Sequence, residues 1–261
     1  MKKISLKPLM FLLVLSLQVA LGQFNKNVVI AHRGAWKQQN LPENSIASLK
    51  EAIRLGCHAS EFDVHLTKDN VMVVNHDPHF KDMEIATSTY GELLAKQLDN
   101  GENIPTVEAY ILEGMRQKGT KLILEIKSSS LGKDRTLELT KRAVAMVKKL
   151  KAQKWVEYIC FDYDAGKLVH KLDRKAKVAY LNGDIAPEQV KKDGYTGLDY
   201  KYTVYEKHPK WIAEAHKIGL SVNAWTVNGA EPMKNLLLQD VEYITTNEPE
   251  LLFKVIEESA K

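Results

Sequence analysis

Short apolar runs alternate with helical segments along almost the whole chain, and this alternation limits the possible folds more than any other feature. Several of the runs are apolar almost throughout, which is typical of parallel strands that are covered on both faces. Eight such strand–helix units follow one another in a chain of 261 residues. The sequence therefore predicts an α/β fold, and the number of units favours a (β/α)8 barrel, or TIM barrel, over an open doubly wound sheet.

The predicted strands are residues 27–32, 59–66, 121–127, 155–161, 177–181, 197–201, 220–225 and 241–245. Residues 71–75 are expected to form a hairpin with the second strand. Residues 79–104 are the least regular part of the chain, and we predict a small insertion after the second strand rather than a second domain. The predicted helices include Tyr90–Leu98 in this insertion and Lys207–Lys217 nearer the C-terminus. No glycine-rich phosphate loop follows any strand, which argues further against the open sheet.

The first 22 residues have the layout of a secretory signal peptide. Three lysines precede an apolar run from Leu9 to Leu21, and small residues before Gln23 suit cleavage. The run is shorter than the roughly 20 apolar residues that a membrane-spanning helix needs, which disfavours the alternative of an uncleaved anchor. We expect a signal peptide at 1–22, one domain at 23–261, and an exported protein that is periplasmic or secreted.

Net charge and cysteine content narrow the functional classes. Removal of residues 1–22 takes away three lysines and no acid, so 34 basic and 33 acidic side chains remain. This near balance gives no indication of nucleic-acid binding. Cys57 and Cys160 each lie beside apolar residues and are predicted to be buried free thiols, although an exported location would permit a disulfide.

Acidic residues occur where the alternation predicts buried strands. Glu61 and Asp63 are two residues apart, and the period of two in a strand puts them on the same side. Glu125 ends the next strand of the predicted barrel, and strand ends on that face carry the functional groups of TIM barrels. Three acids form an all-oxygen set that suits Mg²⁺ or Ca²⁺. The alternative is a salt-bridge network with Arg33 or Lys127. Glu43 is expected to support the site from the adjoining loop.

Two histidines lie beside this acidic set in the predicted barrel. His32 ends the first strand and His76 ends the hairpin after the second. Histidine exchanges protons near neutral pH, so the pair is predicted to act as acid and base. Arg33 and Lys127 offer fixed positive charge for an anion, as a phosphoryl transition state requires. The combination predicts phosphodiester chemistry.

Six short motifs occur in order along the chain, namely H-R-G from His32, P-E-N-S from Pro42, E-F-D-V from Glu61, T-K-D from Thr67, V-V-N-H-D-P from Val73 and E-I-K from Glu125. In these motifs the chain resembles the glycerophosphodiester phosphodiesterase family, over essentially all of residues 23–261. The resemblance implies a TIM-barrel enzyme that hydrolyses glycerophosphodiesters, which are deacylated phospholipids, to an alcohol and sn-glycerol 3-phosphate.

The resemblance also implies a role for each residue that matches the motifs. The expected catalytic acid–base pair is His32 and His76, and the expected ligands of a divalent metal are Glu61, Asp63 and Glu125. The expected substrate contacts are Arg33 and Lys127 at the phosphate, with Trp225 lining the pocket. One histidine would deprotonate the attacking hydroxyl and the other would protonate the leaving alcohol.

The chain departs from the family pattern at three points that bear on headgroup preference. Asn247 stands in the segment T-N-E-P where an aspartate is usual, and His58 stands where an aspartate usually precedes the metal pair. Residues 79–104 form only a short insertion, which is too small to enclose a large substrate.

Two other functions compete with this interpretation. A cyclising phospholipase that acts on intact lipids would need an apolar rim or interfacial helix, and no strongly amphipathic basic segment provides one. An exported protein that binds phosphodiesters without turnover would be expected to lack a histidine or a metal acid, yet all are present.

Overall fold

Eight parallel strands close into a barrel in the computed structural model, which describes residues 23–259. The strands are β1 (Val29–Ala31), β2 (Ala59–Leu66), β6 (Lys121–Ile126), β7 (Val156–Cys160), β8 (Val178–Tyr180), β9 (Gly197–Lys201), β10 (Ser221–Trp225) and β11 (Tyr243–Thr246). They lie side by side in this order, and β1 pairs with both β11 and β2, which closes the circle. The predicted TIM barrel is confirmed. The predicted signal peptide lies outside the described residues.

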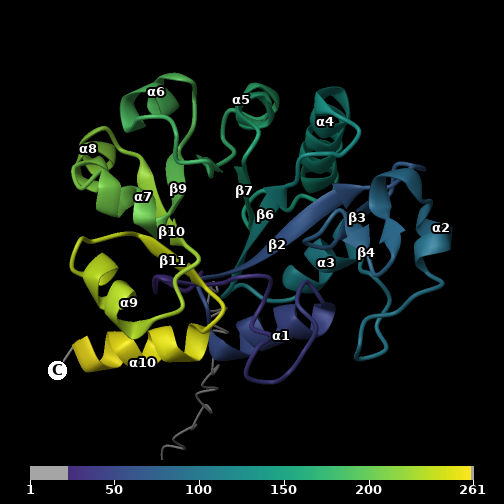
Figure 1. The fold of residues 1–261 in the computed structure, drawn as a ribbon, viewed down its shortest axis with the longest axis horizontal. Coiled ribbons are helices and arrows are strands. Elements are labelled where there is room, and N and C mark those ends of the chain that lie inside the picture. Colours follow the sequence, from purple (N-terminus) through teal and green to yellow (C-terminus); the bar gives the residue numbers. More distant parts are fainter. Residues whose placement is uncertain (1–22, 260–261) are drawn as a thin grey trace, which may run out of the picture.

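Helices surround the barrel on its outer side (Figure 1). They are α1 (Ile46–Leu55), α3 (Val107–Gly114), α4 (Lys133–Lys149), α5 (Tyr163–Leu172), α6 (Pro187–Lys192), α7 (Tyr202–Lys207), α8 (Trp211–Lys217), α9 (Ala230–Leu237) and α10 (Pro249–Ser259). Among residues 23–259, no helix combines the length and apolar character needed to cross a membrane.

The predicted insertion after β2 is present as a small antiparallel unit at one side of the barrel (Figure 1). It comprises β3 (Met72–Val74), β4 (His79–Phe80), β5 (Met83–Glu84), a 3-10 helix η1 (Ile85–Thr87) and α2 (Tyr90–Leu93). The unit has its own apolar cluster, which includes Phe80, Ile85 and Leu93. Glu102 ties it to the barrel, because its carboxylate accepts hydrogen bonds from the free N–H groups of Ile46 and Ala47 at the start of α1.

Two predicted helices have the wrong extent. The helix predicted over Lys207–Lys217 begins only at Trp211, as α8, because Pro209 disfavours helical backbone at the preceding His208, whose φ and ψ are −124° and 66°. Lys207 instead ends the separate helix α7. The predicted helix Tyr90–Leu98 ends at Leu93. The hairpin of β4 and β5 had no counterpart in the sequence prediction, because its two-residue strands are too short to show a period.

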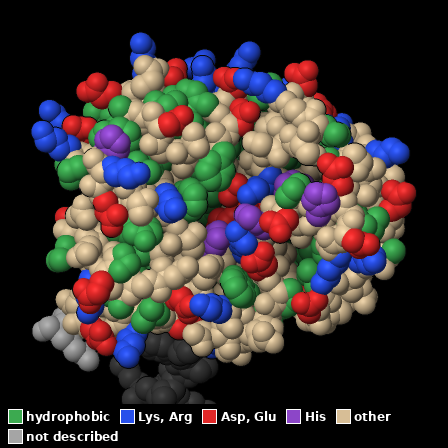
Figure 2. Space-filling view, viewed as in Figure 1, with side chains coloured by type: hydrophobic (Ala, Val, Ile, Leu, Met, Phe, Trp, Pro, Cys, Tyr) green, Lys and Arg blue, Asp and Glu red, His purple; other side chains and the backbone are tan. Residues whose placement is uncertain are grey.

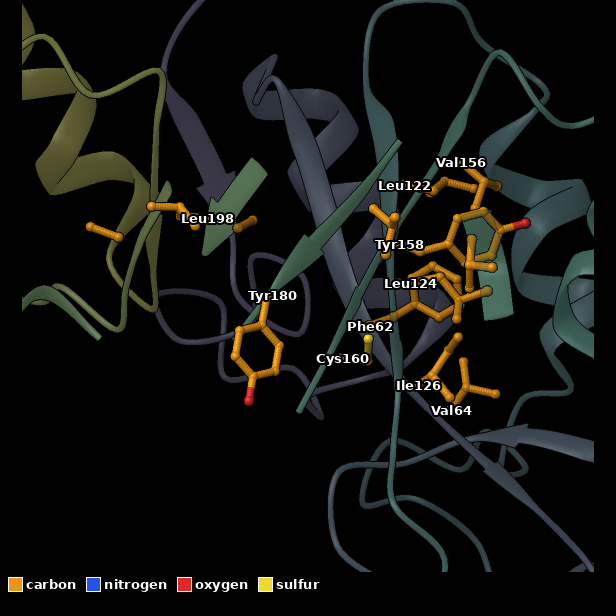
Figure 3. Packing of buried hydrophobic residues seen from close by; sticks show 14 of the residues in the cluster. Phe62, Val64, Leu122, Leu124, Ile126, Val156, Tyr158, Cys160, Tyr180 and Leu198 are labelled. Atoms are coloured by element: carbon orange, nitrogen blue, oxygen red, sulfur yellow. The ribbon is translucent and has the colours of Figure 1, made fainter. Parts of the chain in front are cut away.

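Strand β2 shows how the barrel separates apolar from functional side chains. Phe62 and Val64 point outward and pack with Leu122, Leu124 and Ile126 of β6 beneath the helices (Figure 3). The side chains of Phe62, Leu122 and Leu124 are fully buried. Side chains alternate along a strand, so Glu61 and Asp63, which alternate with Phe62 and Val64, point into the barrel. Packing of the outer face therefore fixes the direction of the acids.

Ion pairs lie at the end of the barrel opposite to the acids of β2. Glu157 on β7 pairs with Lys121 on β6 and with Lys177, whose Nζ lies 3.5 Å from Glu157 Oε1. Burial alone would raise the pKa of Glu157, but Lys121 and Lys177 outweigh it and hold this pKa below its usual range. The ionised carboxylate is thus more stable in the folded protein than in the unfolded chain.

We predict that Glu157→Gln lowers the free energy of unfolding at pH 7 by about 2 kcal/mol, because two lysines lose their shared partner. The ionised Glu157 carboxylate stabilises the fold at pH values above the unfolded-state pKa of about 4.3. This stabilisation is lost as the pH falls towards the lower pKa of the folded state. The difference between wild type and variant should therefore shrink at acid pH. Urea unfolding at pH 7 and pH 3.5 measures it, and an equal difference at both pH values would contradict the assignment.

Candidate active site

The predicted site residues converge on one pocket at the carboxyl ends of the strands. A pocket of about 650 Å³ is lined by His32, Arg33, Glu61, His76, Glu125, Lys127, Ile159, Phe161, Leu181, Asp199, Trp225, Thr226 and Thr245. Figure 2 shows histidine, acidic and basic side chains gathered around a hollow near the centre of one face, with hydrophobic side chains along part of its edge. The outermost of these residues, His32 and Thr245, are 213 positions apart in the sequence, and barrel closure brings them together.

Three carboxylates form a compact group at one wall of this pocket. Glu61, Asp63 and Glu125 each offer an oxygen within 4.8 Å of the others, and all three side chains are buried. The parallel register of β2 and β6 sets Asp63 directly beside Glu125. The convergence predicted from the two-residue spacing in β2 is therefore present.

The ionisation of the group reflects burial and mutual repulsion. Burial, together with the charges of Asp63 and Glu125, raises the pKa of Glu61 well above its usual range. Burial and the neighbouring Asp63 raise the pKa of Glu125 to about 7. Burial would also raise the pKa of Asp63, but Lys127 and other donors outweigh it and lower this pKa. Without further positive charge, the three acids do not all ionise readily at neutral pH.

Lys127 and Arg33 supply part of that charge. Lys127 Nζ lies 2.8 Å from Glu125 Oε1 and 3.2 Å from Asp63 Oδ1. Arg33 Nε lies 3.7 Å from Asp63 Oδ2, but its Nη1 donates to both oxygens of Glu43 at 2.9 Å. Part of the predicted salt-bridge alternative is thus real. Glu43 lies against Arg33 rather than within the carboxylate group.

Glu61 remains without a cation among the described residues. Its Oε1 is buried and has no hydrogen-bond partner, and its Oε2 accepts only the backbone N–H of Arg33, at 2.8 Å. No lysine or arginine pairs with it, and its contact with His32 Nε2 is 3.9 Å. An unsatisfied buried carboxylate oxygen beside two other carboxylates fits a hard divalent cation, which takes oxygen ligands. The residues present therefore fit Mg²⁺ or Ca²⁺.

The loop after β1 holds the carboxylate group in place through Asn44. The Asn44 amide donates to Asp63 Oδ2 at 2.8 Å, and its carbonyl accepts the backbone N–H of Asp63 at 3.1 Å. Asn44 has a left-handed backbone with φ of 58°, which asparagine tolerates better than most residues. Ser45 follows as the N-cap of α1. Nothing in the sequence pattern indicated this role of Asn44.

His32 is held by the segment that departs from the family pattern. Its Nδ1 lies 2.7 Å from Asn247 Oδ1 in the loop after β11. An amide oxygen only accepts hydrogen bonds, so Nδ1 carries the proton and Nε2 presents a lone pair. Burial, with the positive charge of Arg33, lowers the pKa of His32 to about 4, so the ring is neutral at pH 7.

His76 reaches the same pocket from the insertion. Its Nδ1 lies 2.7 Å from Asp77 Oδ1, a carboxylate that is exposed to solvent. The ring of His65 on β2 donates to the backbone oxygen of His76 at 3.1 Å, which fixes the chain at this point. The two histidines therefore have different partners, a neutral amide for His32 and a carboxylate for His76.

The remaining wall of the pocket is largely apolar. Trp225 on β10 packs edge to face against Phe161, with ring centroids 5.6 Å apart. The indole N–H of Trp225 donates to the backbone oxygen of Asp199 at 2.8 Å, which fixes the ring. Trp225 thus lies where the sequence analysis predicted. Asp199 itself was missed, although an acid within the short strand 197–201 is the same signal that identified Glu61.

Comparison with known proteins identifies the family of this chain. The model of the glycerophosphoryl diester phosphodiesterase family matches residues 32–251. The chain belongs to this family. As a member it is a glycerophosphodiester phosphodiesterase, a phosphoric diester hydrolase.

Individual relatives agree with this placement over most of their length. A glycerophosphodiester phosphodiesterase of Caldanaerobacter subterraneus is 28% identical over 252 residues, which cover 88% of this chain and 98% of that protein. The crystal structure of a glycerophosphodiester phosphodiesterase from Parabacteroides distasonis is 41% identical and superimposes with a TM-score of 0.87, covering 91% of this chain and all of the other. An Oleispira antarctica phosphodiesterase, solved with its product sn-glycerol-3-phosphate, shares the fold at 23% identity, a TM-score of 0.71 and coverage of 88% and 96%.

We predict that Mg²⁺ or Ca²⁺ stabilises the protein against unfolding and that Glu61→Gln abolishes this effect. A ligand that binds only the folded state at about 100 times its dissociation constant adds about 2.7 kcal/mol. Thermal unfolding of metal-stripped protein, with each ion added back, measures the effect without reference to catalysis.

Glu157→Gln is the matched control for this measurement, because it neutralises a barrel carboxylate at the opposite end. It should keep the full response to the ion. Equal stabilisation of wild type and Glu61→Gln, or none in wild type with either ion, would argue against a metal at the carboxylate group.

Proposed function

We propose that the protein hydrolyses glycerophosphodiesters to an alcohol and sn-glycerol 3-phosphate, with Mg²⁺ or Ca²⁺ held by Glu61, Asp63 and Glu125. The convergence of three buried carboxylates, two histidines and two basic side chains in one pocket supports this most strongly. The Oleispira relative, which shares the fold, was solved with sn-glycerol-3-phosphate as its product. When bound, the cation would neutralise the carboxylates and draw electron density from a phosphoryl oxygen.

Arg33 and Lys127 hold the phosphate in this proposal. Both line the pocket, and both are partly buried, with 19% and 16% of their side chains exposed. Arg33 Nε lies 3.7 Å from Asp63 Oδ2 and has no hydrogen-bond partner among the described residues, so the guanidinium charge is held beside the carboxylate group. Positive charge that is fixed in advance stabilises the extra negative charge of the transition state without reorganisation.

His32 acts as the general base toward the attacking hydroxyl. The hydrogen bond to Asn247 keeps the proton on Nδ1, so the Nε2 lone pair faces the pocket beside Glu61. The attacking group is the 2-hydroxyl of the glycerol moiety. Its oxygen bonds to phosphorus as the bond to the leaving alcohol breaks, and His32 Nε2 takes the hydroxyl proton.

His76 acts as the general acid toward the leaving alcohol. The carboxylate of Asp77 accepts the hydrogen bond of Nδ1–H and so orients the ring, and a proton on Nε2 can pass to the alcohol oxygen. Water then opens the cyclic phosphate, with the roles reversed. His76 takes a proton from water and His32 returns its proton to the glycerol 2-oxygen, which restores both rings.

The two competing functions receive less support. Large apolar side chains that are more than a third exposed are scattered over the described residues, namely Leu94, Leu112, Leu131, Phe161, Leu172 and Leu238. Of these only Phe161 lines the pocket, so the most exposed large apolar side chains of the described residues do not gather around it. A protein that only binds phosphodiesters would not need both histidines with separate hydrogen-bond partners.

We also propose export to the periplasm or medium, on the sequence of residues 1–22 alone.

We predict that His32→Ala and His76→Ala each lower kcat by about 10²- to 10⁴-fold, the range for loss of a general acid or base. Both variants should retain stabilisation by the metal ion, because neither residue belongs to the carboxylate group. Release of sn-glycerol 3-phosphate from glycerophosphodiesters measures kcat.

His79, an exposed histidine three residues after His76, gives a matched control. His79→Ala should keep kcat within about twofold, because this residue is not among those that line the pocket. Near-native kcat in His32→Ala and His76→Ala would show that the acid–base assignment is wrong.

A further inference from the structure

Asp199 lies at the floor of the pocket, and the proposed mechanism does not use it. Its strand, β9, is four positions from β2 around the barrel, so Asp199 lies across the pocket from the carboxylate group. The residue is only 1% exposed, and its Oδ1 has no hydrogen-bond partner among the described residues. Burial of a carboxyl oxygen without a partner is unfavourable, so a group that fills this position from the pocket would be bound favourably.

Of the polar side chains around Asp199, only Asn223 lies close enough to its carboxyl group to lower its pKa, and Asn223 Oδ1 also has no partner among the described residues. Asn223, its neighbour in the register of β9 and β10, donates an amide hydrogen to Thr245 Oγ1 at 2.9 Å. The indole of Trp225 donates to the backbone oxygen of Asp199, not to its carboxyl group. The two basic side chains of the pocket pair with the acids on the other side. Asp199 Oδ1 is thus left without a partner among the described residues, and Asp199 itself is part of the pocket lining.

The walls of the pocket indicate the kind of group that Asp199 receives. Ile159, Leu181, Phe161 and Trp225 line the space beside it, so a ligand there has carbon atoms against these walls and a polar atom at the floor. Burial, offset in part by Asn223, raises the pKa of Asp199 to about 8. A neutral carboxyl group both donates and accepts hydrogen bonds, and so does an alcohol hydroxyl.

We propose that Asp199 is a specificity-determining residue that forms a hydrogen bond with an uncharged hydroxyl group of the substrate. This inference rests on the proposed function and identifies the substrate class more closely as phosphodiesters of polyols. The hydroxyl can come from the glycerol moiety or from a polyol in the leaving alcohol. In either case Asp199 discriminates between hydroxylated and hydroxyl-free ligands.

Binding of two product-sized ligands tests the inference without turnover. sn-Glycerol 3-phosphate and n-propyl phosphate have the same carbon chain and phosphate, but only the first carries hydroxyl groups. If Asp199 binds the glycerol moiety, replacing it with the similar-sized leucine should reduce the preference for sn-glycerol 3-phosphate by about tenfold, leaving n-propyl phosphate affinity unchanged. Calorimetric titration of wild type and Asp199→Leu, in the presence of the same cation, measures both affinities.

Turnover of two substrates identifies the source of the hydroxyl. The leaving alcohol of glycerophosphoinositol is a polyol, whereas that of glycerophosphocholine is choline, which carries no further hydroxyl group. An equal loss of kcat/KM for both substrates in Asp199→Leu, with the binding preference also lost, assigns the hydroxyl to glycerol. A loss of about tenfold for glycerophosphoinositol alone assigns it to the leaving alcohol. If Asp199→Leu leaves both the binding preference and the substrate ratio unchanged, the inference is wrong.

Two further variants keep the test interpretable. Asp199→Asn retains a group that donates and accepts, so it should keep most of the discrimination, whereas a purely structural role for the carboxyl group predicts no such rescue. Asp199→Ala replaces the leucine variant if the latter does not fold. Glu157→Gln, at the other end of the barrel, should leave both ratios unchanged. If wild type cleaves no glycerophosphodiester, the proposed function fails, while the binding comparison still decides whether Asp199 contacts the glycerol moiety.

Discussion

The repulsion among three buried carboxylates is the constraint on which the rest of the site depends. Glu61, Asp63 and Glu125 lie within 4.8 Å of one another in a region that water hardly reaches. Each neighbouring interaction offsets part of this repulsion. Lys127 pairs with two of the acids, Asn44 donates to Asp63, and the backbone N–H of Arg33 donates to Glu61. Glu61 Oε1 remains without a partner among the described residues, and a divalent cation would offset this remaining deficit of positive charge.

The barrel makes such an arrangement tolerable by separating stabilising contacts from functional ones. Outward-facing side chains of β2 and β6 pack beneath the helices and fix the strands, as the cluster around Phe62 and Leu124 shows (Figure 3). Inward-facing positions are then free to carry polar groups whose burial is unfavourable. Ion pairs of Glu157 with Lys121 and Lys177 lie at one end of the barrel, and the hollow in Figure 2 opens at the catalytic end. Stability and chemistry thus occupy opposite ends of one scaffold.

Sequence patterns predicted those parts of the structure that depend on local periodicity. The two-residue spacing of Glu61 and Asp63 placed both on one side of a strand, and the alternation of strands and helices predicted the barrel. The register that sets Asp63 beside Glu125 depends on pairing between distant strands, which no local pattern encodes. The role of Asn44 was missed for the same reason, because its contact with Asp63 spans a loop and a helix. Asp199 was overlooked although its signal was present, and Pro209 should have indicated the break between α7 and α8.

The most direct test of this account is the release of sn-glycerol 3-phosphate from glycerophosphodiesters by metal-stripped protein, before and after addition of Mg²⁺ or Ca²⁺. The account predicts almost no release without the ion and turnover that returns with one of the two ions in wild type but not in Glu61→Gln. Undiminished release by fully stripped, folded protein would contradict it, because the carboxylate group would then have no part in the reaction.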